Sequence, residues 1–177
     1  LERFRRTQGV TVRINSRPRG NVGTSAENPR EADAQAPRYQ AIVASANNVQ
    51  RESNSSFANK NENRRSILVI GGAGFIGSFV VSELLKTNVG KVIIYDNFAR
   101  GKLSNVSGSL SDPRCEIYPN GGDVRDIDIL NDAMQGCDAV IHLAAMWLLH
   151  CKDFPRTAFH VNIEGTFNVL EACVKNK

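Results

Sequence analysis

From Ser66 onward, short runs of apolar residues take turns with segments in which apolar residues recur every three or four positions. This pattern predicts strands and helices in turn. Four short apolar runs have the length and the β-branched content of buried strands: 67–70, 91–95, 115–118 and 139–143. Helical spacing of apolar residues predicts a helix over 75–87, a second between Asp126 as N-cap and Gly136, and a long third that Pro155 opens. That last helix carries one apolar face: Phe159, Ile163, Phe167, Leu170 and Val174.

This alternation predicts an α/β fold with a parallel sheet covered by helices on both faces. Right-handed crossovers favour the strand order 3-2-1-4, which is part of a Rossmann doubly wound sheet. Strands 1 and 4 then flank the topological switch point, where such sheets bind ligands outside their carboxyl ends. We therefore expect residues 66–177 to form part of a doubly wound α/β domain with a ligand site at this point.

Residues 1–65 have a different composition. They hold 12 Lys+Arg against 6 Asp+Glu, whereas residues 66–177 hold 10 against 12, so the overall charge of +4 comes from the first third. Asn, Ser, Arg, Pro and Gly dominate there and little apolar area could be buried, which predicts a basic, largely disordered tail. A basic arm can bind nucleic acid, but no aromatic residues are interleaved for base stacking, so this remains the weakest of the functional hypotheses.

Other features of the composition narrow the class of protein. No apolar run approaches the roughly 18 residues of a membrane span, and no secretory signal core is present. The four cysteines form no C-x-x-C motif and make no metal-ligand spacing with the three histidines. We expect reduced thiols in a cytoplasmic protein without a metal site.

Three glycines at intervals of three, Gly71, Gly74 and Gly77, follow the first strand and open the first helix. In this position Gly71 makes the tight turn, Gly74 lets a pyrophosphate approach, and Gly77 lets helix and strand pack closely. Asp96 ends the second strand 19 residues after Gly77, where a carboxylate accepts ribose hydroxyls and favours NAD over NADP. The structural alternative is that Asp96 caps a loop, and Arg100 nearby could instead attract a phosphate.

Five motifs occur in register: GGAGFIG, YDNFARG, GDVRD, HLAA and VNIEGTFNVLEA. In this order and at these distances they resemble the extended short-chain dehydrogenases, the NAD-dependent epimerase/dehydratase family that works on nucleotide sugars, with UDP-glucose 4-epimerase as a representative. The resemblance covers about Ile67 to Val174 and implies that residues 66–177 form the N-terminal part of an NAD-binding Rossmann domain.

The resemblance implies a set of cofactor contacts. The backbone at Phe75 and Ile76 would face the pyrophosphate, and Asn97 would share the ribose loop with Asp96. Asp123 and Val124 would contact adenine, with a helix N-cap as the alternative role of Asp123. The remaining implied positions lie near the nicotinamide end: Leu143, Ala144, Ala145 and Asn162. His142 is interpreted as a packed structural histidine, and an amide bonded to a backbone carbonyl is an equally good role for Asn162. Trp147 could line a substrate pocket or a dimer surface, but it is expected in the core.

The catalytic residues that the family implies are a tyrosine with a lysine four residues later. Residues four after the three tyrosines, Tyr39, Tyr95 and Tyr118, are Val43, Ala99 and Gly122, so no such pair is present in this sequence. The expectation is the NAD-binding portion of a nucleotide-sugar epimerase or dehydratase, homodimeric when complete and inactive alone. A non-catalytic dinucleotide-sensing protein is the alternative. An unpaired fourth strand is expected to promote association.

Overall fold

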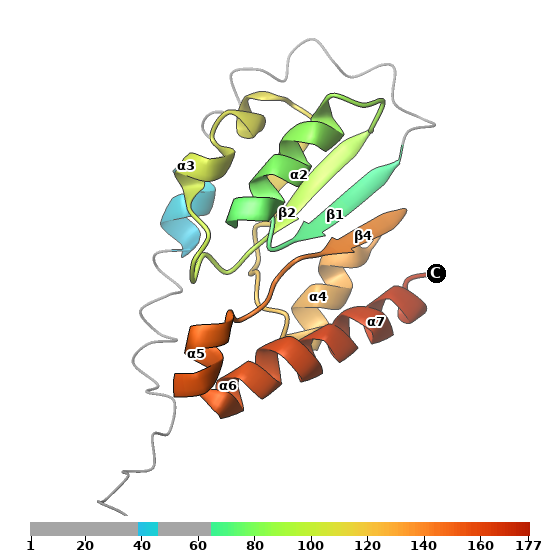
Figure 1. Ribbon diagram of the computed structural model, residues 1–177. Coiled ribbons are helices and arrows are strands. Elements are labelled where there is room, and N and C mark those ends of the chain that lie inside the picture. Colours follow the sequence, from blue (N-terminus) through green and yellow to red (C-terminus); the bar gives the residue numbers. More distant parts are fainter. Residues whose placement is uncertain (1–38, 46–64) are drawn as a thin grey trace, which may run out of the picture.

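The computed structural model describes residues 39–45 and 65–177, and its centre is a sheet of four parallel strands (Figure 1). The strand order is β3-β2-β1-β4, as predicted, with both neighbours of β1 parallel to it. The strands are short and centred on the predicted runs: β1 (Ser66–Ile70), β2 (Lys91–Tyr95), β3 (Cys115–Ile117) and β4 (Ala139–His142). The partial Rossmann fold expected from the alternation is therefore confirmed.

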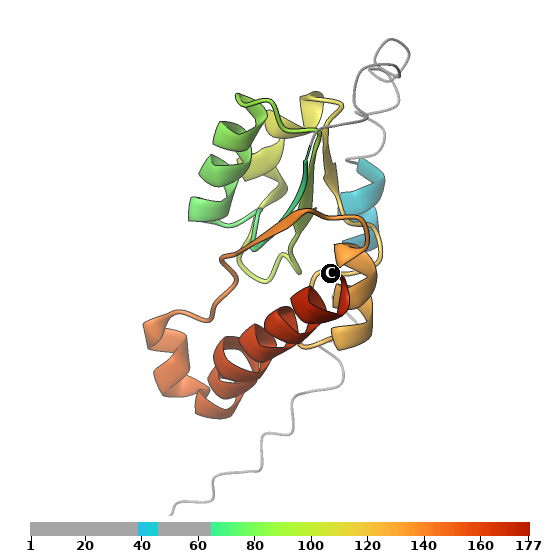
Figure 2. The same ribbon diagram turned by 90° about the vertical axis from the view of Figure 1, so that its right-hand side faces the viewer.

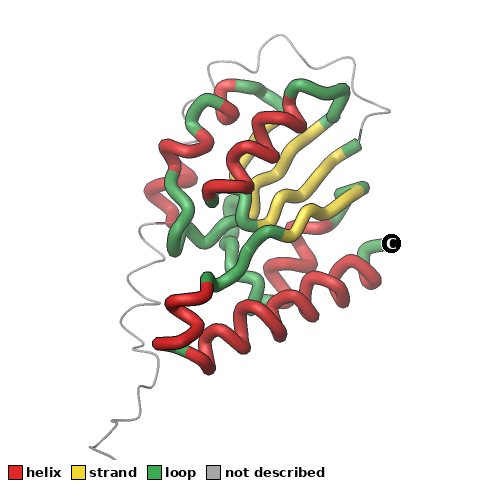
Figure 3. The backbone as a smooth tube through the Cα atoms, in the orientation of Figure 1, coloured by secondary structure: helices red, strands yellow, loops and turns green. Residues whose placement is uncertain are grey.

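Helices connect the strands and cover both faces of the sheet (Figures 2 and 3). Those between β1 and β3 are α2 (Phe75–Leu85), α3 (Leu103–Val106) and the 3-10 turn η1 (Ser109–Ser111). Those after β3 are α4 (Ile127–Met134), α5 (Leu148–Asp153), α6 (Pro155–Phe159), the π-helical turn η2 (His160–Glu164) and α7 (Gly165–Lys175). Helix α2 lies on one face, and α4 and α7 pack together on the other.

The core forms two clusters, one on each face of the sheet. Val69, Ile94 and Val81 are fully buried between the sheet and α2. On the other face, Leu68 and Tyr95 are fully buried with Leu130 of α4. Successive residues of β1 and β2 thus point to opposite faces, which explains why these strands are continuously apolar.

Helix α4 begins as the sequence predicts. The Asp126 side chain accepts a hydrogen bond from the backbone N–H of Ile129 at 3.2 Å, so it is the N-cap. Leu130 and Met134 are buried on one helical face, and Gly136 follows the helix with a φ of +72°. The left-handed glycine ends the helix without the steric cost that a side chain would add.

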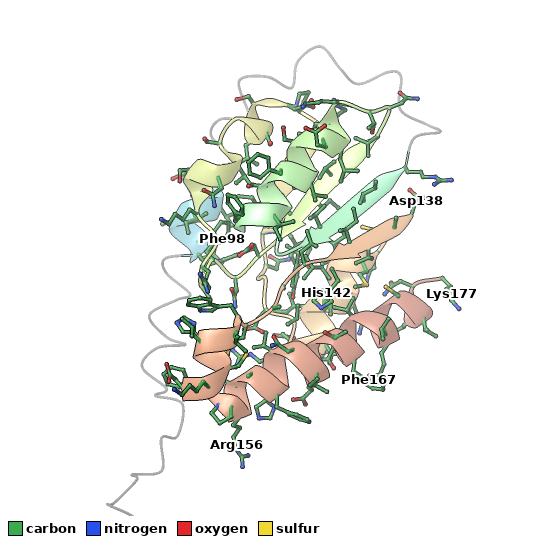
Figure 4. The ribbon with its side chains drawn as sticks, viewed as in Figure 1. Phe98, Asp138, His142, Arg156, Phe167 and Lys177 are labelled. Carbon is green, nitrogen blue, oxygen red and sulfur yellow. The ribbon has the colours of Figure 1, made fainter. Side chains whose placement is uncertain are left out.

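The helix expected after Pro155 differs from the prediction. It is interrupted by the π-helical turn η2, and the predicted apolar face is exposed, with 56–64% of each side chain in solvent: Phe159, Ile163, Phe167, Leu170 and Val174. Figure 4 shows Phe167 on the side of α7 away from the sheet. The residues that pack inward are small, such as Val169 and Ala172, which are 4% and 0% exposed. The helix packs on its less bulky side because that side lets α7 approach α4 closely.

Segment 39–45 was assigned to the tail, yet the structure describes it as a short helix, coloured cyan in Figure 1. Val43 is only 5% exposed and joins the cluster on the α2 face, with Tyr39 and Ile42 packed beside it. Their spacing of three and four residues places all three side chains on one helical face. The rest of the predicted tail lies outside the described residues.

A membrane span is not found in the described part of the chain, since none of its helices is long and apolar enough.

Candidate functional site

A cavity of about 550 Å³ opens at the carboxyl ends of the strands. The loops that follow all four strands line it, which is the usual place of a ligand in an open α/β sheet. Nine of the predicted cofactor contacts lie on its wall: Gly71, Gly74, Asp96, Asn97, Asp123, Val124, Leu143, Ala144 and Ala145. The topology therefore brings most of the predicted positions to one cavity.

The glycine turn forms one wall of the cavity, and its geometry leaves no space for a side chain at two of its glycines. Gly71 has a φ of +80°, and a Cβ added to it would stand 2.7 Å from the backbone nitrogen of Ala144. A Cβ on Gly77 would stand 2.1 Å from the carbonyl oxygen of Gly71. Both distances are shorter than real carbon contacts, so a side chain at either position would push the turn away from β4 or α2.

Gly74 is the N-cap of α2, and no side chain caps this helix. A Cβ there would meet only the carbonyl of Gly71, at 3.1 Å. Gly74 thus leaves its side of the cavity open next to the positive end of the helix dipole. This arrangement of backbone N–H groups suits an anion such as a pyrophosphate.

Four predicted positions do not line the cavity: Phe75, Ile76, Gly77 and Asn162. The residues Phe75 and Ile76 are 80% and 64% exposed. The ring centroids of Phe75 and Phe79 lie 5.5 Å apart on the outer surface of α2. The prediction for Phe75 and Ile76 concerned the backbone, and their side chains face solvent. Gly77 lies beneath the turn, where it allows the close packing described above.

Asp96 is 7% exposed and fastens two loops together. Its Oδ2 accepts from the backbone N–H of Ala73 at 2.9 Å, and its Oδ1 accepts from that of Phe98 at 2.8 Å. Burial raises the pKa of the Asp96 carboxyl, and the backbone hydrogen bonds oppose this rise. The predicted loop-capping alternative is therefore realised, and Asp96 also lines the cavity.

Asp123 is held by its own loop. Arg125 donates to it through Nε at 3.0 Å and through Nη2 at 2.8 Å, and Asn97 donates from Nδ2 at 3.4 Å. Burial would raise the pKa of the Asp123 carboxyl, but the hydrogen bonds from Arg125 outweigh it and leave the pKa below its ordinary value. Asp123 therefore carries its charge in the cavity wall, and the cap of α4 is Asp126 instead.

Val124 and Gly165 fit closely together. Val124 is 3% exposed, and a Cβ on Gly165 would stand 2.5 Å from its Cγ2 atom. Gly165 is therefore a packing residue, and it lets α7 approach the loop that carries Asp123.

Asn162 lies on η2 and binds the backbone of Met146 twice. Its Oδ1 accepts from the N–H of Met146 at 2.7 Å, and its Nδ2 donates to the carbonyl of the same residue at 2.9 Å. Asn162 does not line the cavity, although Met146 does. The structure thus shows the backbone-bonding role that was one of its two expected functions.

His142 sits between β4 and α7 (Figure 4). Its Nε2 lies 3.2 Å from Oγ1 of Thr166, and burial lowers the pKa of its ring. The position matches the expectation of a packed structural histidine. Trp147, in contrast, was expected in the core and is 44% exposed, because it lies in the loop after β4 under the guanidinium of Arg100, 4.7 Å from the ring centroid.

Sequence reasoning missed two glycines that shape the site. A Cβ on Gly101 would stand 2.7 Å from Oδ1 of Asp96, and one on Gly122 would stand 2.1 Å from the Asp96 carbonyl oxygen. Both line the cavity. Both could have been found from the sequence, because each is a glycine in a loop that follows a strand and each lies within a quoted motif, YDNFARG or GDVRD. Among the described residues no group of His, Cys, Asp and Glu could hold a metal ion.

Comparisons with known proteins agree with this geometry. The profile of the 3-beta hydroxysteroid dehydrogenase/isomerase family matches residues 68–177. The UDP-glucose 4-epimerase of Rickettsia bellii is 35% identical over 118 residues, which are 64% of this chain and 34% of that protein. The same enzyme of Rickettsia felis is 33% identical over 117 residues, with the same coverage.

Two solved structures are similar at comparable coverage. The dTDP-glucose 4,6-dehydratase of Streptomyces venezuelae, with NAD and TYD bound, has a TM-score of 0.59 at 31% identity, covering 63% of this chain and 36% of that one. The UDP-glucose-4-epimerase of Stenotrophomonas maltophila, with bound NAD and formylated UDP-arabinopyranose, has a TM-score of 0.55 at 31% identity, covering 61% and 33%.

The chain spans about a third of the length of these relatives. It belongs to the extended short-chain dehydrogenases, the NAD-dependent epimerase/dehydratase family, and is UDP-glucose 4-epimerase-like over that third.

Proposed function

We propose that this chain is the NAD-binding portion of a nucleotide-sugar epimerase or dehydratase. The observation that carries the proposal is the side-chain-free turn at Gly71 and Gly74, which opens one cavity together with two acidic residues, Asp96 and Asp123. The sequence relatives are UDP-glucose 4-epimerases, and two similar structures hold NAD with a nucleotide or a nucleotide sugar.

The residues present fit the adenosine diphosphate half of NAD. The backbone of the glycine turn and the N-terminus of α2 would bind the pyrophosphate, with Phe75 and Ile76 contributing backbone N–H groups. Asp96 would accept the ribose hydroxyls through its free lone pairs, with Asn97 beside it, and Asp123 and Val124 would contact adenine. NAD, when bound, accepts a hydride from a sugar carbon and returns it.

The nicotinamide end would extend toward the loop after β4. Leu143, Ala144 and Ala145 leave room there because two of them have small side chains. Asn162 would act indirectly, by fixing the backbone of Met146 on the cavity wall.

Proton transfer is not supplied by the tyrosines of this chain. Burial raises the pKa of Tyr39 to about 12 and raises the pKa of Tyr95 as well. The hydroxyl of Tyr95 donates to the carbonyl of Asp123 at 2.8 Å, and that of Tyr39 donates to backbone carbonyls. Neither has a lysine four residues later. We therefore propose that the chain binds the cofactor and that the whole enzyme, as a homodimer acting on a nucleotide sugar, requires further residues for chemistry.

The proposal is tested by titrating the 177-residue chain with NAD, NADH and NADP in a calorimeter. Saturable binding of NAD and NADH, with weaker binding of NADP, is the expected result, because Asp96 repels a 2′-phosphate. The variant Gly74→Ala should weaken NAD binding by about tenfold, since its methyl group occupies the wall where the phosphates approach. Gly108→Ala is the matched control, because a Cβ at Gly108 meets nothing within 4 Å. Absence of saturable binding up to roughly 1 mM NAD would refute the proposal.

A second candidate is an NAD-dependent oxidoreductase of a hydroxysteroid, because the matching profile carries that family name. Activity of the longer protein toward a UDP-sugar and a 3β-hydroxysteroid, measured side by side, distinguishes the two. A non-catalytic dinucleotide sensor would bind NAD and convert neither.

A further inference from the structure

Tyr39 connects the segment before the Rossmann sheet to a loop of the cavity. Its hydroxyl shares one proton between the carbonyl oxygens of Tyr118 and Gly121, the latter at 2.9 Å. These carbonyls are 79 and 82 residues away in sequence. The hydrogen bonds therefore fix a long-range contact that no regular element of the sheet provides.

The loop from Tyr118 to Asp123 has little regular structure of its own. It contains Gly121, which has a φ of +141°, and Gly122, which lies so close to the backbone of Asp96 that there is no room for a Cβ. It ends at Asp123, whose carboxylate stands in the cavity wall. Glycines lower the cost of leaving this conformation, so contacts from outside the loop help to hold it in place. The hydroxyl of Tyr95 holds its end, at the carbonyl of Asp123, and Tyr39 holds the part before it.

The ring of Tyr39 reaches the neighbouring loop. It lies 6.1 Å from the ring of Phe98, centroid to centroid. Phe98 is 5% exposed, has a φ of 55°, and donates its backbone N–H to Asp96. Figure 4 shows Phe98 close to the segment 39–45. One side chain thus contacts the loop that carries Asp96 and the loop that carries Asp123.

The segment is anchored independently of these contacts. Val43 is 5% exposed within the core cluster, and Ile42 packs against that cluster. The apolar anchor holds the helix at the edge of the sheet, which leaves the hydroxyl of Tyr39 free to act on the loop. Anchor and hydroxyl can therefore be separated by mutation.

We propose that Tyr39 is a positioning residue that holds the loops carrying Asp96 and Asp123 in place and thereby sets the affinity of the cavity for the adenosine end of a dinucleotide. The inference rests on the proposed function. It assigns a role in ligand binding to a segment that precedes the Rossmann sheet. The role belongs to the hydroxyl, which is protonated and able to donate at neutral pH, and burial raises the pKa of Tyr39 further.

The test compares three variants of the 177-residue chain. Tyr39→Phe keeps the ring against Phe98 and removes the hydroxyl. Val43→Ala weakens the anchor and keeps the hydroxyl, and Ser45→Ala removes an exposed hydroxyl that bonds only within the same segment. AMP and NAD are titrated into each variant, and thermal unfolding is recorded in parallel.

We expect Tyr39→Phe to weaken AMP and NAD by the same factor, about fivefold, because the loss of one or two hydrogen bonds acts at the end that both ligands share. Val43→Ala should lower the unfolding temperature while both affinities stay within about twofold. Ser45→Ala should change neither. Unchanged affinities in Tyr39→Phe, or a loss confined to NAD, would overturn the inference.

Backbone amide exchange of residues 118–122 in the ligand-free chain separates the two proposals. Faster exchange in Tyr39→Phe and not in Ser45→Ala supports the positioning role, even where neither ligand binds and the proposed function fails. Unchanged exchange in Tyr39→Phe contradicts the positioning role and leaves the proposed function untouched.

Discussion

The interface between α2 and the sheet is a covered apolar layer, whereas a second apolar face, on the outer side of α6, η2 and α7, is exposed. Between α2 and the sheet, Val69, Val81 and Ile94 are fully buried. On the outer side of α6, η2 and α7, the large residues Phe159 and Phe167 are 56% and 58% exposed. The spacing of apolar residues therefore predicts that a helix has an apolar face, but it does not predict whether that face is buried. Burial depends on the rest of the molecule or on a partner.

The covered layer should be least tolerant where it has no free space. Gly77→Ala should destabilise the chain by about 3 kcal/mol or more, because its methyl group would overlap the carbonyl of Gly71. Urea unfolding followed by far-UV circular dichroism measures this. Gly108→Ala serves as the control and should change the free energy of unfolding by less than about 0.5 kcal/mol. Equal effects of the two variants would show that α2 does not approach the turn closely.

Helix α7 has a buried and an exposed apolar residue next to each other in sequence. Val169 is 4% exposed and Leu170 is 60% exposed. Val169→Ala should lower the free energy of unfolding by about 1–3 kcal/mol, and Leu170→Ala by less than about 0.5 kcal/mol, although leucine loses more atoms. Chemical denaturation of both variants checks the order. A larger loss in Leu170→Ala would mean that the outer face is covered in solution.

A polar network supports the covered layer at the other end of the sheet. Arg114 donates to Asp112 at 2.8 Å through Nη2 and also to the carbonyls of Thr87 and Val89, while both charged side chains are less than a third exposed. Asp112→Asn should cost about 1–2 kcal/mol of stability at neutral pH.

The pH dependence of this effect has a definite sign. Hydrogen bonding from Arg114 lowers the pKa of Asp112 below its ordinary value of 3.8, and burial opposes this only in part. The network therefore stabilises the fold above that ordinary value and loses its contribution as the pH falls through the lowered pKa. Unfolding measured from about pH 7 to about pH 2 should show the stabilities of Asp112→Asn and the parent converging in acid. A constant difference across this range would contradict the prediction.

The smallest change in stability is expected on the uncovered face. The double variant Phe167→Glu/Leu170→Glu should leave the free energy of unfolding within about 0.5 kcal/mol, since both side chains are exposed. It should, however, reduce association of the chain, because two charges interrupt the apolar surface. Sedimentation velocity of parent and variant at equal concentrations tests this. Equal association in both would exclude this face as its cause.

The sequence was sufficient for the order of the strands and for most of the cavity wall. Strand order follows from alternation and handedness, and the glycines and Asp96 lie at strand ends where topology brings them together. It was insufficient for Trp147 and for the segment 39–45. Trp147 lies outside the core because a contact with Arg100 holds it across two loops, and three apolar residues in a polar stretch are too few to predict a packed helix.

The partners of individual hydrogen bonds were beyond prediction, although a loop cap at Asp96 and a backbone bond at Asn162 were among the expected alternatives. Asp96 binds the backbone of Ala73, 23 residues away, and Asn162 binds the backbone of Met146, 16 residues away. Such pairs depend on where two loops meet in three dimensions, and no local pattern specifies that meeting point.

The π-helical turn η2 contains one residue more than a regular helix would need between α6 and α7. A single π turn is geometrically an α-helix with one residue inserted, because its hydrogen bonds span five residues instead of four. Deleting one residue from His160–Glu164 would restore a regular helix and would rotate α6 by about 100° relative to α7. We expect that Asn162 would then turn away from Met146, which would break the bond between this helix and the cavity wall.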